Sequence, residues 1–367
     1  MRILLTVPSL DPTFGGPTTK VFALSDALRD RRYHVKVVGC GSGGTAVGLP
    51  VFVRYHGTPF PRSTRALTTL VRGADLVHII GLRDPVGVVA AIAARRSNVP
   101  YVIEPVGMHR PRLRNVLLKT VYDKAVGDGI LQHAKVVVAT SRLEATELIR
   151  DGVRATRVRV RPNGIDVDGL LPLPPRGAFR QQLGLSSEAA LLVSIGRIAR
   201  KKRSVDIARA IARMPRVHAA IVGPDAGDGT LEELERAQSS LGIQGRLHVI
   251  PRWVEGAEKA RLLADADVFC LPSLTENFGI AAAEAAAVGL PVVVSGACGV
   301  AEYLDPACSR VVEARDVTAL VSALEELVTD ATIKPKTEAA AVRLRARLSW
   351  HGVSGDQAAI YRASLAS

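Results

Sequence analysis

The hydrophobic residues of this 367-residue chain occur in short runs that alternate with segments of helical periodicity. In the first half, five apolar runs predict strands buried on both faces. They cover residues 2–8, 34–40, 76–81, 101–107 and 135–141. Helical patterns lie between them, at 19–32, 87–97 and 114–131. This alternation predicts a parallel sheet with helices on both sides.

The second half repeats the pattern. Its predicted strands are 190–198, 218–224, 246–253, 268–273 and 291–295, and its predicted helices are 204–214, 229–242 and 258–266. The proline-rich stretch at 169–177 is the best linker candidate between the halves. We therefore expect domains at 1–168 and 169–345 and a helical tail at 346–367, for which a return to the first domain is left open.

Composition narrows the class of protein. The apolar fraction of 47% supports a sizeable core, and aromatic residues make up only 4%. The four cysteines form no C-x-x-C pair and have no nearby histidine, which predicts reduced, buried thiols rather than a metal site. No apolar run approaches the length of a membrane span.

The charge is concentrated in the first half. Residues 1–165 contain 25 Lys and Arg against 11 Asp and Glu, a net charge of +14, whereas the remainder has a net charge of −1. This asymmetry favours an anionic partner such as a membrane surface, a phosphorylated acceptor or nucleic acid. A basic solubilising surface without a partner is the competing interpretation.

Two glycine- or cation-rich clusters follow predicted strands. Gly15 and Gly16 come after the first strand, where adjacent glycines let the backbone approach an anion, although the spacing is not G-x-G-x-x-G. Arg197 and Lys202 follow the strand at 190–198. A guanidinium and an ammonium delivered into one loop can clamp a diphosphate, and a solvated basic loop is the alternative.

The third cluster is the stretch ENFGIAAAE, residues 276–284. A helix starting near Ile280 would point its first N–H groups at a phosphate. Glu276 would lie in the loop and Glu284 about one turn into the helix. A charge at Glu284 on so apolar a helix requires a partner. A neutral ligand rich in hydroxyls would bind both carboxylates without a buried cation.

In combination, these motifs resemble the signature of glycosyltransferase family 4. The E-x7-E element is followed by AxxxGLPVVVS, and RPNGIDVD, VSIGRIARKK, IVGPD and EKARLLADADVFCLPS occur in the family's order. The resemblance covers most of residues 1–310. It implies a GT-B fold of two Rossmann-like α/β domains facing across a cleft, and a retaining, metal-independent transferase that uses a nucleoside-diphosphate sugar as co-substrate.

The resemblance also implies roles for individual residues. Arg197 and Lys202 would hold the donor diphosphate, Glu276 the hydroxyls of the donor sugar, and Glu284 the ribose. The residues that the resemblance places near the donor are Gly15, Gly16, Trp253, Val254, Asn277, Phe278, Gly279 and Ile280. The chain departs from the family at Arg203 and Arg252, where a glycine is usual, and at Val106, where His or Arg is common; His109 is the candidate substitute.

Two acidic motifs are interpreted as structural. Asp265 and Asp267 mimic a D-x-D metal site, but they precede a strand and so predict the end of a helix. Asp166 and Asp168 mimic the start of a calcium loop that no glutamate closes. No essential metal or cofactor is expected, and the cations and the helix start would stabilise the leaving diphosphate instead.

The expected reaction moves a hexosyl or N-acetylhexosaminyl unit, from a UDP-sugar by preference, to an acceptor hydroxyl with retention. GDP-mannose with a lipid-linked acceptor is the alternative. The family is usually described by front-face attack, in which the acceptor hydroxyl approaches on the side of the leaving group and no enzymatic nucleophile is needed. The two domains would close over the donor about a hinge near 166–177. The acceptor, a saccharide, aminocyclitol or lipid-linked sugar, would lie on the basic half. The segment 109–126 is interpreted either as an interfacial helix, which would place a cytoplasmic protein at the inner face of the membrane, or as a core-packed helix with a solvated basic face.

Three rival functions were weighed. An epimerase would need a His-rich or acidic centre that the sequence lacks. A silent nucleotide-binding scaffold would be expected to lose Glu276, which is present. A nucleic-acid binder would need aromatic residues among the arginines for stacking, and few are there.

Overall fold

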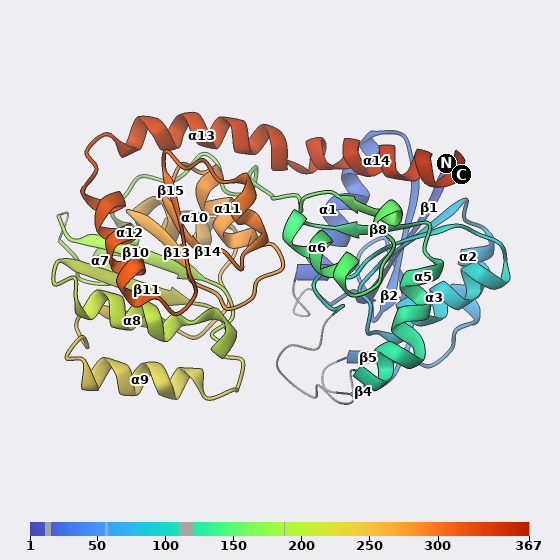
Figure 1. Cartoon of the computed structure of the whole chain (residues 1–367), viewed down its shortest axis with the longest axis horizontal. Helices are drawn as coiled ribbons and strands as arrows, with labels where there is room; N and C mark the ends of the chain where they lie inside the picture. Colours follow the sequence, from blue (N-terminus) through green and yellow to red (C-terminus); the bar gives the residue numbers. More distant parts are fainter. Residues whose placement is uncertain (12–15, 56–57, 110–119, 187, 367) are drawn as a thin grey trace. The chain divides into compact units, whose positions relative to one another are not determined.

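The chain folds into two compact α/β units, each with its own core (Figure 1). The computed structural model describes residues 1–11, 16–55, 58–109, 120–186 and 188–366. Unit 1 comprises Met1–Gly164 and Trp350–Ser367, and unit 2 comprises Ile165–Ser349. Both ends of the chain therefore belong to unit 1. The proline-rich stretch 169–177 lies within unit 2, where Leu170 is buried.

Unit 1 is built on a 7-stranded parallel sheet with the order β3-β2-β1-β6-β7-β8-β9. Its strands are β1 (Arg2–Ser9), β2 (His34–Cys40), β3 (Val47–Leu49), β6 (Leu76–Ile80), β7 (Tyr101–Glu104), β8 (Val136–Ala139) and β9 (Val158–Val160). A separate antiparallel pair consists of β4 (Val51–Tyr55) and β5 (Thr58–Pro61). Every residue of β6, β7 and β8 is buried, as expected for strands covered on both faces.

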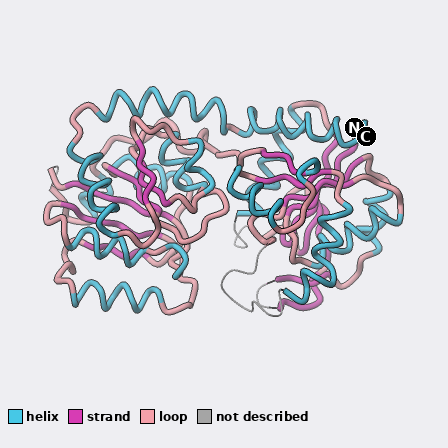
Figure 2. The backbone as a smooth tube through the Cα atoms, viewed as in Figure 1, coloured by secondary structure: helices cyan, strands magenta, loops and turns pink. Residues whose placement is uncertain are grey.

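Helices cover both faces of this sheet (Figure 2). On one face lie α1 (Gly16–Asp30) and α14 (Trp350–Ala366). On the other lie α2 (Arg65–Arg72), α3 (Pro85–Arg96), α5 (Asp128–His133) and α6 (Arg142–Arg150). Short turns of other helical types are η2 (Asp123–Gly127) and η3 (Ala155–Arg157). Asp84 begins α3 by accepting the N–H of Gly87 at 2.7 Å, and Ser141 begins α6 by accepting that of Glu144 at 3.1 Å.

Unit 2 has a 6-stranded parallel sheet with the order β12-β11-β10-β13-β14-β15. Its strands are β10 (Ala190–Ile195), β11 (Val217–Val222), β12 (Leu247–Ile250), β13 (Val268–Leu271), β14 (Val292–Ser295) and β15 (Ser309–Val312). One face packs against α8 (Ser204–Ala212), α9 (Thr230–Ser240) and α12 (Val317–Thr329). The other packs against α7 (Ala178–Gln182), α10 (Gly256–Asp265), α11 (Ile280–Ala287) and α13 (Ile333–Leu348). The turns η4 (Arg200–Lys202) and η5 (Gly299–Tyr303) are 3-10 helices.

The predicted alternation of strands and helices is confirmed in both units, and the differences have local causes. The run 101–107 was expected to be one strand, but β7 ends at Glu104. Pro105 follows without an N–H, and Val106 and Gly107 then adopt φ values of 53° and 71°. The sequence pattern also missed the following elements: β3, β4, β5, β9, β15, α2, α6, α7 and α12.

Candidate functional site

Three loops of unit 2 carry polar residues to one edge of its sheet. They follow the carboxyl ends of β10, β12 and β13, and because all strands of the sheet are parallel, these ends lie along the same edge. The loop after β10 holds Arg197 and Lys202, the loop after β12 holds Trp253 and Val254, and the loop after β13 leads into α11. This edge is where open α/β sheets bind ligands.

The loop after β10 brings an ammonium group over a glycine. Gly196 has φ 148°, and a Cβ placed there would lie 3.5 Å from Nζ of Lys202. Gly223, at the end of the neighbouring β11, also has φ 148°, and a Cβ there would clash at 2.2 Å with the carbonyl oxygen of Gly196. Arg197 is exposed at the same strand end. The two glycines therefore allow the backbones of adjacent loops to pack closely beneath Lys202.

Lys202 forms an ion pair with Glu276, the first carboxylate of the E-x7-E element. Both side chains are 16% exposed, so the pair is partly covered by protein but remains accessible. Burial opposes ionisation of this carboxyl group, but the charges of Lys202 and Lys201 prevail and lower the pKa of Glu276. The carboxylate is thus held ionised at neutral pH as a hydrogen-bond acceptor.

Helix α11 begins beside this pair. Its N-cap, Gly279, has φ 99° and carries no side chain that could cap the helix. A Cβ on Gly279 would lie 3.6 Å from Cγ of Glu276, which places the carboxylate side chain next to the first turn. Ala282 and Ala283 donate to the carbonyl of Gly279, so the N–H groups before them lack intrahelical acceptors and can bind an anion.

The second carboxylate, Glu284, pairs with Lys259 of α10. The partner that the sequence required for Glu284 is therefore present, but the expectation that neither carboxylate needs a cation is wrong, because each one pairs with a lysine. Burial raises the pKa of Glu284 and Lys259 opposes the rise, so the two carboxyl groups shift in opposite directions. The sequence analysis did not identify Lys259 as the partner of Glu284. The available signal was that a helix predicted to follow β12 places this lysine near the same edge of the sheet.

The remaining predicted donor residues differ in exposure. Trp253 is 56% exposed and its indole N–H donates to Glu255 at 3.0 Å, whereas Val254 is buried in the core. Phe278 is buried, and its carbonyl accepts the N–H of Val300 at 2.7 Å. Asn277 and Ile280 are partly exposed. Phe278 therefore anchors the loop, and its neighbours are the residues open to a ligand.

Comparison with known proteins gives the family. The description "Glycosyl transferases group 1" matches residues 175–345, and "Glycosyl transferase 4-like domain" matches residues 15–164. A D-inositol 3-phosphate glycosyltransferase of Xylanimonas cellulosilytica is 30% identical over 286 residues, which cover 74% of this chain and 68% of that protein. D-inositol 3-phosphate glycosyltransferase 2 of Catenulispora acidiphila is 29% identical over 395 residues, covering 96% and 90%. The chain belongs to glycosyltransferase family 4.

The fold of this family 4 glycosyltransferase is GT-B, as expected from its motifs. The Anabaena protein Alr3699/HepE, solved in complex with UDP, has a TM-score of 0.80 to this structure at 20% identity, over 99% of this chain and 100% of that one. At that identity the likeness establishes the fold. The two parallel sheets of this structure, each covered by helices on both faces, agree with that fold.

In unit 1 of the glycosyltransferase, His109 faces away from solvent. Its side chain is 1% exposed, and its Nε2 lies 3.6 Å from Glu147 and 3.9 Å from Asp151, both at the end of α6. Val106, the position where the family commonly has His or Arg, is a β-branched residue at φ 53°, an unusual conformation that marks a constrained loop. Gly16 begins α1 in open space, and Gly15 lies outside the described residues.

Unit 1 also contains a buried charged cluster that the sequence analysis missed. Glu104, at the end of β7, pairs with Lys20 of α1 and with Arg161, and all three side chains are at most 2% exposed. Arg161 also donates to Gln357 of α14 at 2.9 Å. Burial lowers the pKa of Lys20 well below its usual value. The lone glutamate in the apolar run YVIE was the signal for this cluster.

The D-x-D motif is structural, as predicted. Asp265 ends α10 and accepts the N–H groups of Phe179 at 2.6 Å and Arg180 at 2.9 Å, which cap the start of α7. Asp267 accepts from the guanidinium of Arg180 and the N–H of Leu191, both at 2.7 Å. Within the described residues there is no group of three or more metal-ligating side chains, and no helix there is long and apolar enough to cross a bilayer.

Replacing Asp265 by alanine will destabilise unit 2 by about 1–3 kcal/mol, because several backbone donors lose their buried acceptor. Urea denaturation of parent and variant measures this effect. The affinity for nucleotide-sugar of the folded variant should stay within about twofold of the parent, since Asp265 serves α7 rather than the ligand edge. A large loss of metal-dependent activity without a loss of stability would contradict this structural role.

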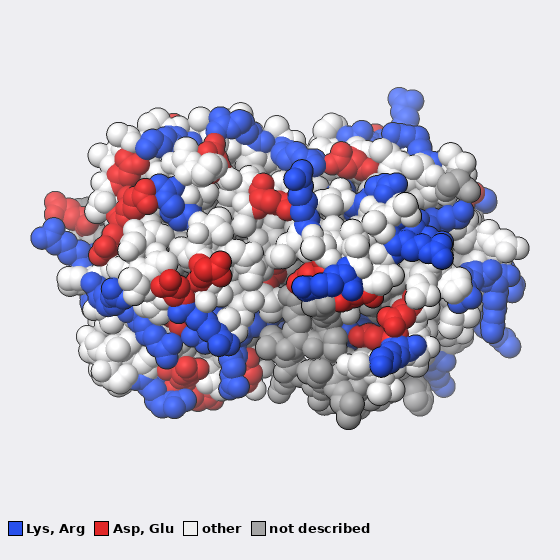
Figure 3. All heavy atoms as spheres, in the orientation of Figure 1, with Lys and Arg blue, Asp and Glu red and all other residues white. Residues whose placement is uncertain are grey.

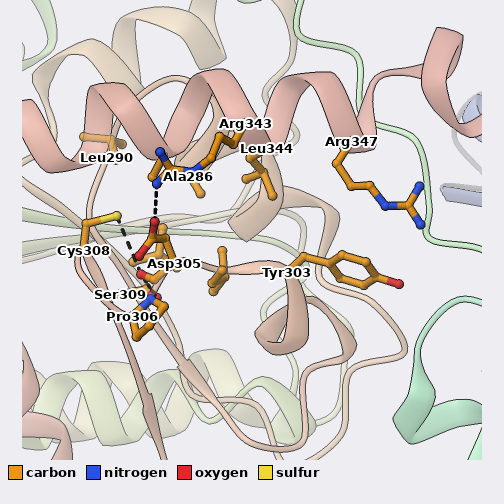
Figure 4. A pocket seen from close by; sticks show the side chains of 13 residues that line it. Ala286, Leu290, Tyr303, Asp305, Pro306, Cys308, Ser309, Arg343, Leu344 and Arg347 are labelled. Atoms are coloured by element: carbon orange, nitrogen blue, oxygen red, sulfur yellow. Dashed lines mark hydrogen bonds and ion pairs between the residues drawn. The ribbon is translucent and has the colours of Figure 1, made fainter.

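A pocket in unit 2 lies away from the predicted donor residues. It has a volume of about 390 Å³ and is lined by residues that precede β14 and β15, by the end of α11 and by α13 (Figure 4). Arg343 points at Asp305 across it and forms an ion pair. These residues lie at the amino ends of β14 and β15, whereas the predicted donor residues lie at the carboxyl edge. The four cysteines are free and buried, as predicted, and Cys308 lines this cavity.

Proposed function

We propose that this glycosyltransferase moves a hexosyl or N-acetylhexosaminyl unit from a UDP-sugar to an acceptor hydroxyl, with retention at the anomeric carbon. The observation that carries the proposal is the convergence of Lys202, Glu276 and the uncapped start of α11 on one sheet edge. This edge combines the ammonium of Lys202, the ionised carboxylate of Glu276 and the N–H groups at the start of α11. A diphosphate joined to a polyhydroxy sugar presents the matching anion and donors.

In the proposed reaction, the bond between the anomeric carbon and the diphosphate oxygen breaks while the acceptor oxygen bonds to that carbon on the same face. The acceptor proton passes to a phosphate oxygen of the leaving nucleotide. Arg197, Lys202 and the N–H groups at the start of α11 would stabilise the charge that develops on the diphosphate. Glu276 would orient the sugar through its hydroxyls. His109 has no part in this scheme, because its side chain is buried against α6.

The acceptor is proposed to bind unit 1, where the basic excess lies. Residues 1–165 have a net charge of +14, and Figure 3 shows Lys and Arg side chains over this unit with acidic groups among them. The curated relatives are named for D-inositol 3-phosphate, a cyclitol that carries an anionic group. An acceptor of this class matches the charge. A lipid-linked acceptor is the alternative; most of the segment 109–126 on which it depends lies outside the described residues.

A panel of nucleotide-sugars tests the donor. The true donor should raise the melting temperature by mass action, with a stabilisation of about 2.7 kcal/mol at a ligand concentration of 100 times Kd. We expect UDP-glucose or UDP-N-acetylglucosamine to give the largest shift and ADP-sugars the smallest. The shift should persist with excess chelator, since the lysines and the helix start replace a metal. A shift confined to GDP-mannose would replace the UDP proposal, and no shift with any member would overturn the function.

A further inference from the structure

The ion pair between Lys259 and Glu284 joins α10 to α11, two helices that begin at the ligand edge. Lys259 is the fourth residue of α10, which follows β12, and Glu284 is the fifth residue of α11, which follows β13. Helices that follow parallel strands begin at the carboxyl edge of the sheet. The Lys259 side chain is 17% exposed and that of Glu284 is 9% exposed, so a ligand at this edge can reach the pair.

The two lysine–glutamate pairs respond differently to a nucleotide-sugar. Lys202 can leave Glu276 for the diphosphate, because the ligand supplies a negative charge that replaces the carboxylate. A ribose is neutral and supplies no such replacement. Lys259 therefore has no reason to leave Glu284 when a nucleotide binds, since separating the pair would leave a covered charge without a counter-charge.

The geometry leaves part of Glu284 for the ligand. The ammonium of Lys259 is bound to Oε2, and an ionised carboxylate has further acceptor sites on both oxygens. A ribose diol donates two hydroxyl groups and fits an acceptor of this kind. A protonated carboxyl group would instead carry a hydrogen on one oxygen and lose acceptor capacity.

We propose that Lys259 is a positioning residue for nucleotide binding: it holds Glu284 ionised and fixed in orientation, so that the free carboxylate positions accept the ribose hydroxyls. This inference rests on the proposed function, because it assumes a nucleotide-sugar donor at this edge. It assigns to the reaction a residue that the E-x7-E motif does not contain.

The charges around Glu284 make the role measurable. Lys259 on α10 faces it, and Asp166 contributes a repulsive charge from the segment that opens unit 2. Arg345 of α13 donates to the carbonyl of Ala287 at the far end of α11, at 2.6 Å. Burial raises the pKa of Glu284, and Lys259 is the group that opposes this rise. Without Lys259 the pKa will rise further, so the ionised form will need a higher pH.

The test is the Lys259→Met variant, titrated with the nucleotide-sugar that stabilises the parent most in the panel, beginning with UDP-glucose. Its pyrophosphate is a diester and does not titrate near neutrality. We expect affinity to fall by about 10-fold at neutral pH, as for a lost charged hydrogen-bond partner. The loss should deepen as the pH is lowered from about 8 to about 5.5 and shrink as it is raised, because the affinity of the variant falls off at a higher pH than that of the parent.

Two further variants fix the interpretation. Lys259→Arg should recover most of the affinity, because it restores a cation beside Glu284. Glu284→Gln should bind weakly with no pH dependence, since its side chain does not titrate. If Lys259 only joins α10 to α11, Lys259→Met will lower the melting temperature but keep the parent's affinity and pH profile, and the inference is overturned. Failure of the parent to bind any nucleotide-sugar would instead overturn the proposed function.

Discussion

The Lys202→Met variant will transfer sugar about 100- to 1000-fold more slowly than the parent. Lys202 lies over Gly196 at the carboxyl end of β10 and beside the start of α11, where the diphosphate is proposed to bind. A preorganised donor aimed at developing negative charge commonly contributes a factor of this size to kcat. The charge on the leaving nucleotide grows in the transition state, so the loss should fall mainly on kcat rather than on KM.

The variant also removes the counter-charge of Glu276, and this second effect has to be separated from the first. Lys202 is the main charge that lowers the pKa of Glu276, so its removal will raise that pKa. A Lys202→Arg variant keeps a cation beside Glu276 and should recover part of the rate. The matched control is Lys336→Met, which breaks the partly exposed pair between Lys336 of α13 and Asp330 at the end of α12 and should leave transfer unchanged. A Lys202→Met enzyme with more than half of the parent's kcat would show that the lysine is structural.

Much of this site could be predicted from the sequence because its residues follow strands directly. Arg197, Glu276 and Gly279 lie in the loops that follow β10 and β13, and a parallel sheet carries such loops to one edge. The same reasoning identified Asp265 and Asp267 as structural, since they immediately precede a strand. Local order along the chain was therefore sufficient to place these residues, while their roles stay predictions.

The pairing of the charges could not be predicted in this way. Lys259 reaches Glu284 from another helix, and Arg161 reaches Glu104 across 57 positions of the chain. Which cation meets which carboxylate depends on helix packing, and hydrophobic periodicity does not encode it. The end of β7 at Glu104 was missed because proline and positive-φ residues override an apolar run, and β15 was missed because its sequence, SRVV, has only two apolar residues.

Replacing Glu104 by alanine will destabilise unit 1 by about 3–5 kcal/mol, the cost of leaving buried cations without their counter-charge. Glu104 is the carboxylate shared by Lys20 and Arg161, and it is completely buried. The guanidinium of Arg161 cannot lose its proton in this pH range. Lys20 can, because burial already lowers its pKa, so part of the cost will be relieved by deprotonation.

The sequence offers a convenient probe for this experiment. The chain has two tryptophans, of which Trp350 begins α14 in unit 1 and Trp253 lies in unit 2. In a Trp253→Phe background, fluorescence during urea denaturation reports unit 1 alone. The control is Asp26→Ala, which breaks an ion pair whose carboxylate is 72% exposed and should cost less than about 1 kcal/mol.

The pH dependence and a second substitution distinguish a buried charge from simple loss of packing. Burial already lowers the pKa of Lys20 in the folded parent, and removing Glu104 will lower it further, so the unfolded chain binds more protons over a wider pH range in the variant than in the parent. Stability of the variant will therefore rise with pH until the unfolded lysine also deprotonates. Adding Lys20→Met should cost less than the sum of the two single changes, because the second removes a charge that the first left unpaired. Additive losses with no pH dependence would mean that Glu104 acts through its volume and not through its charge.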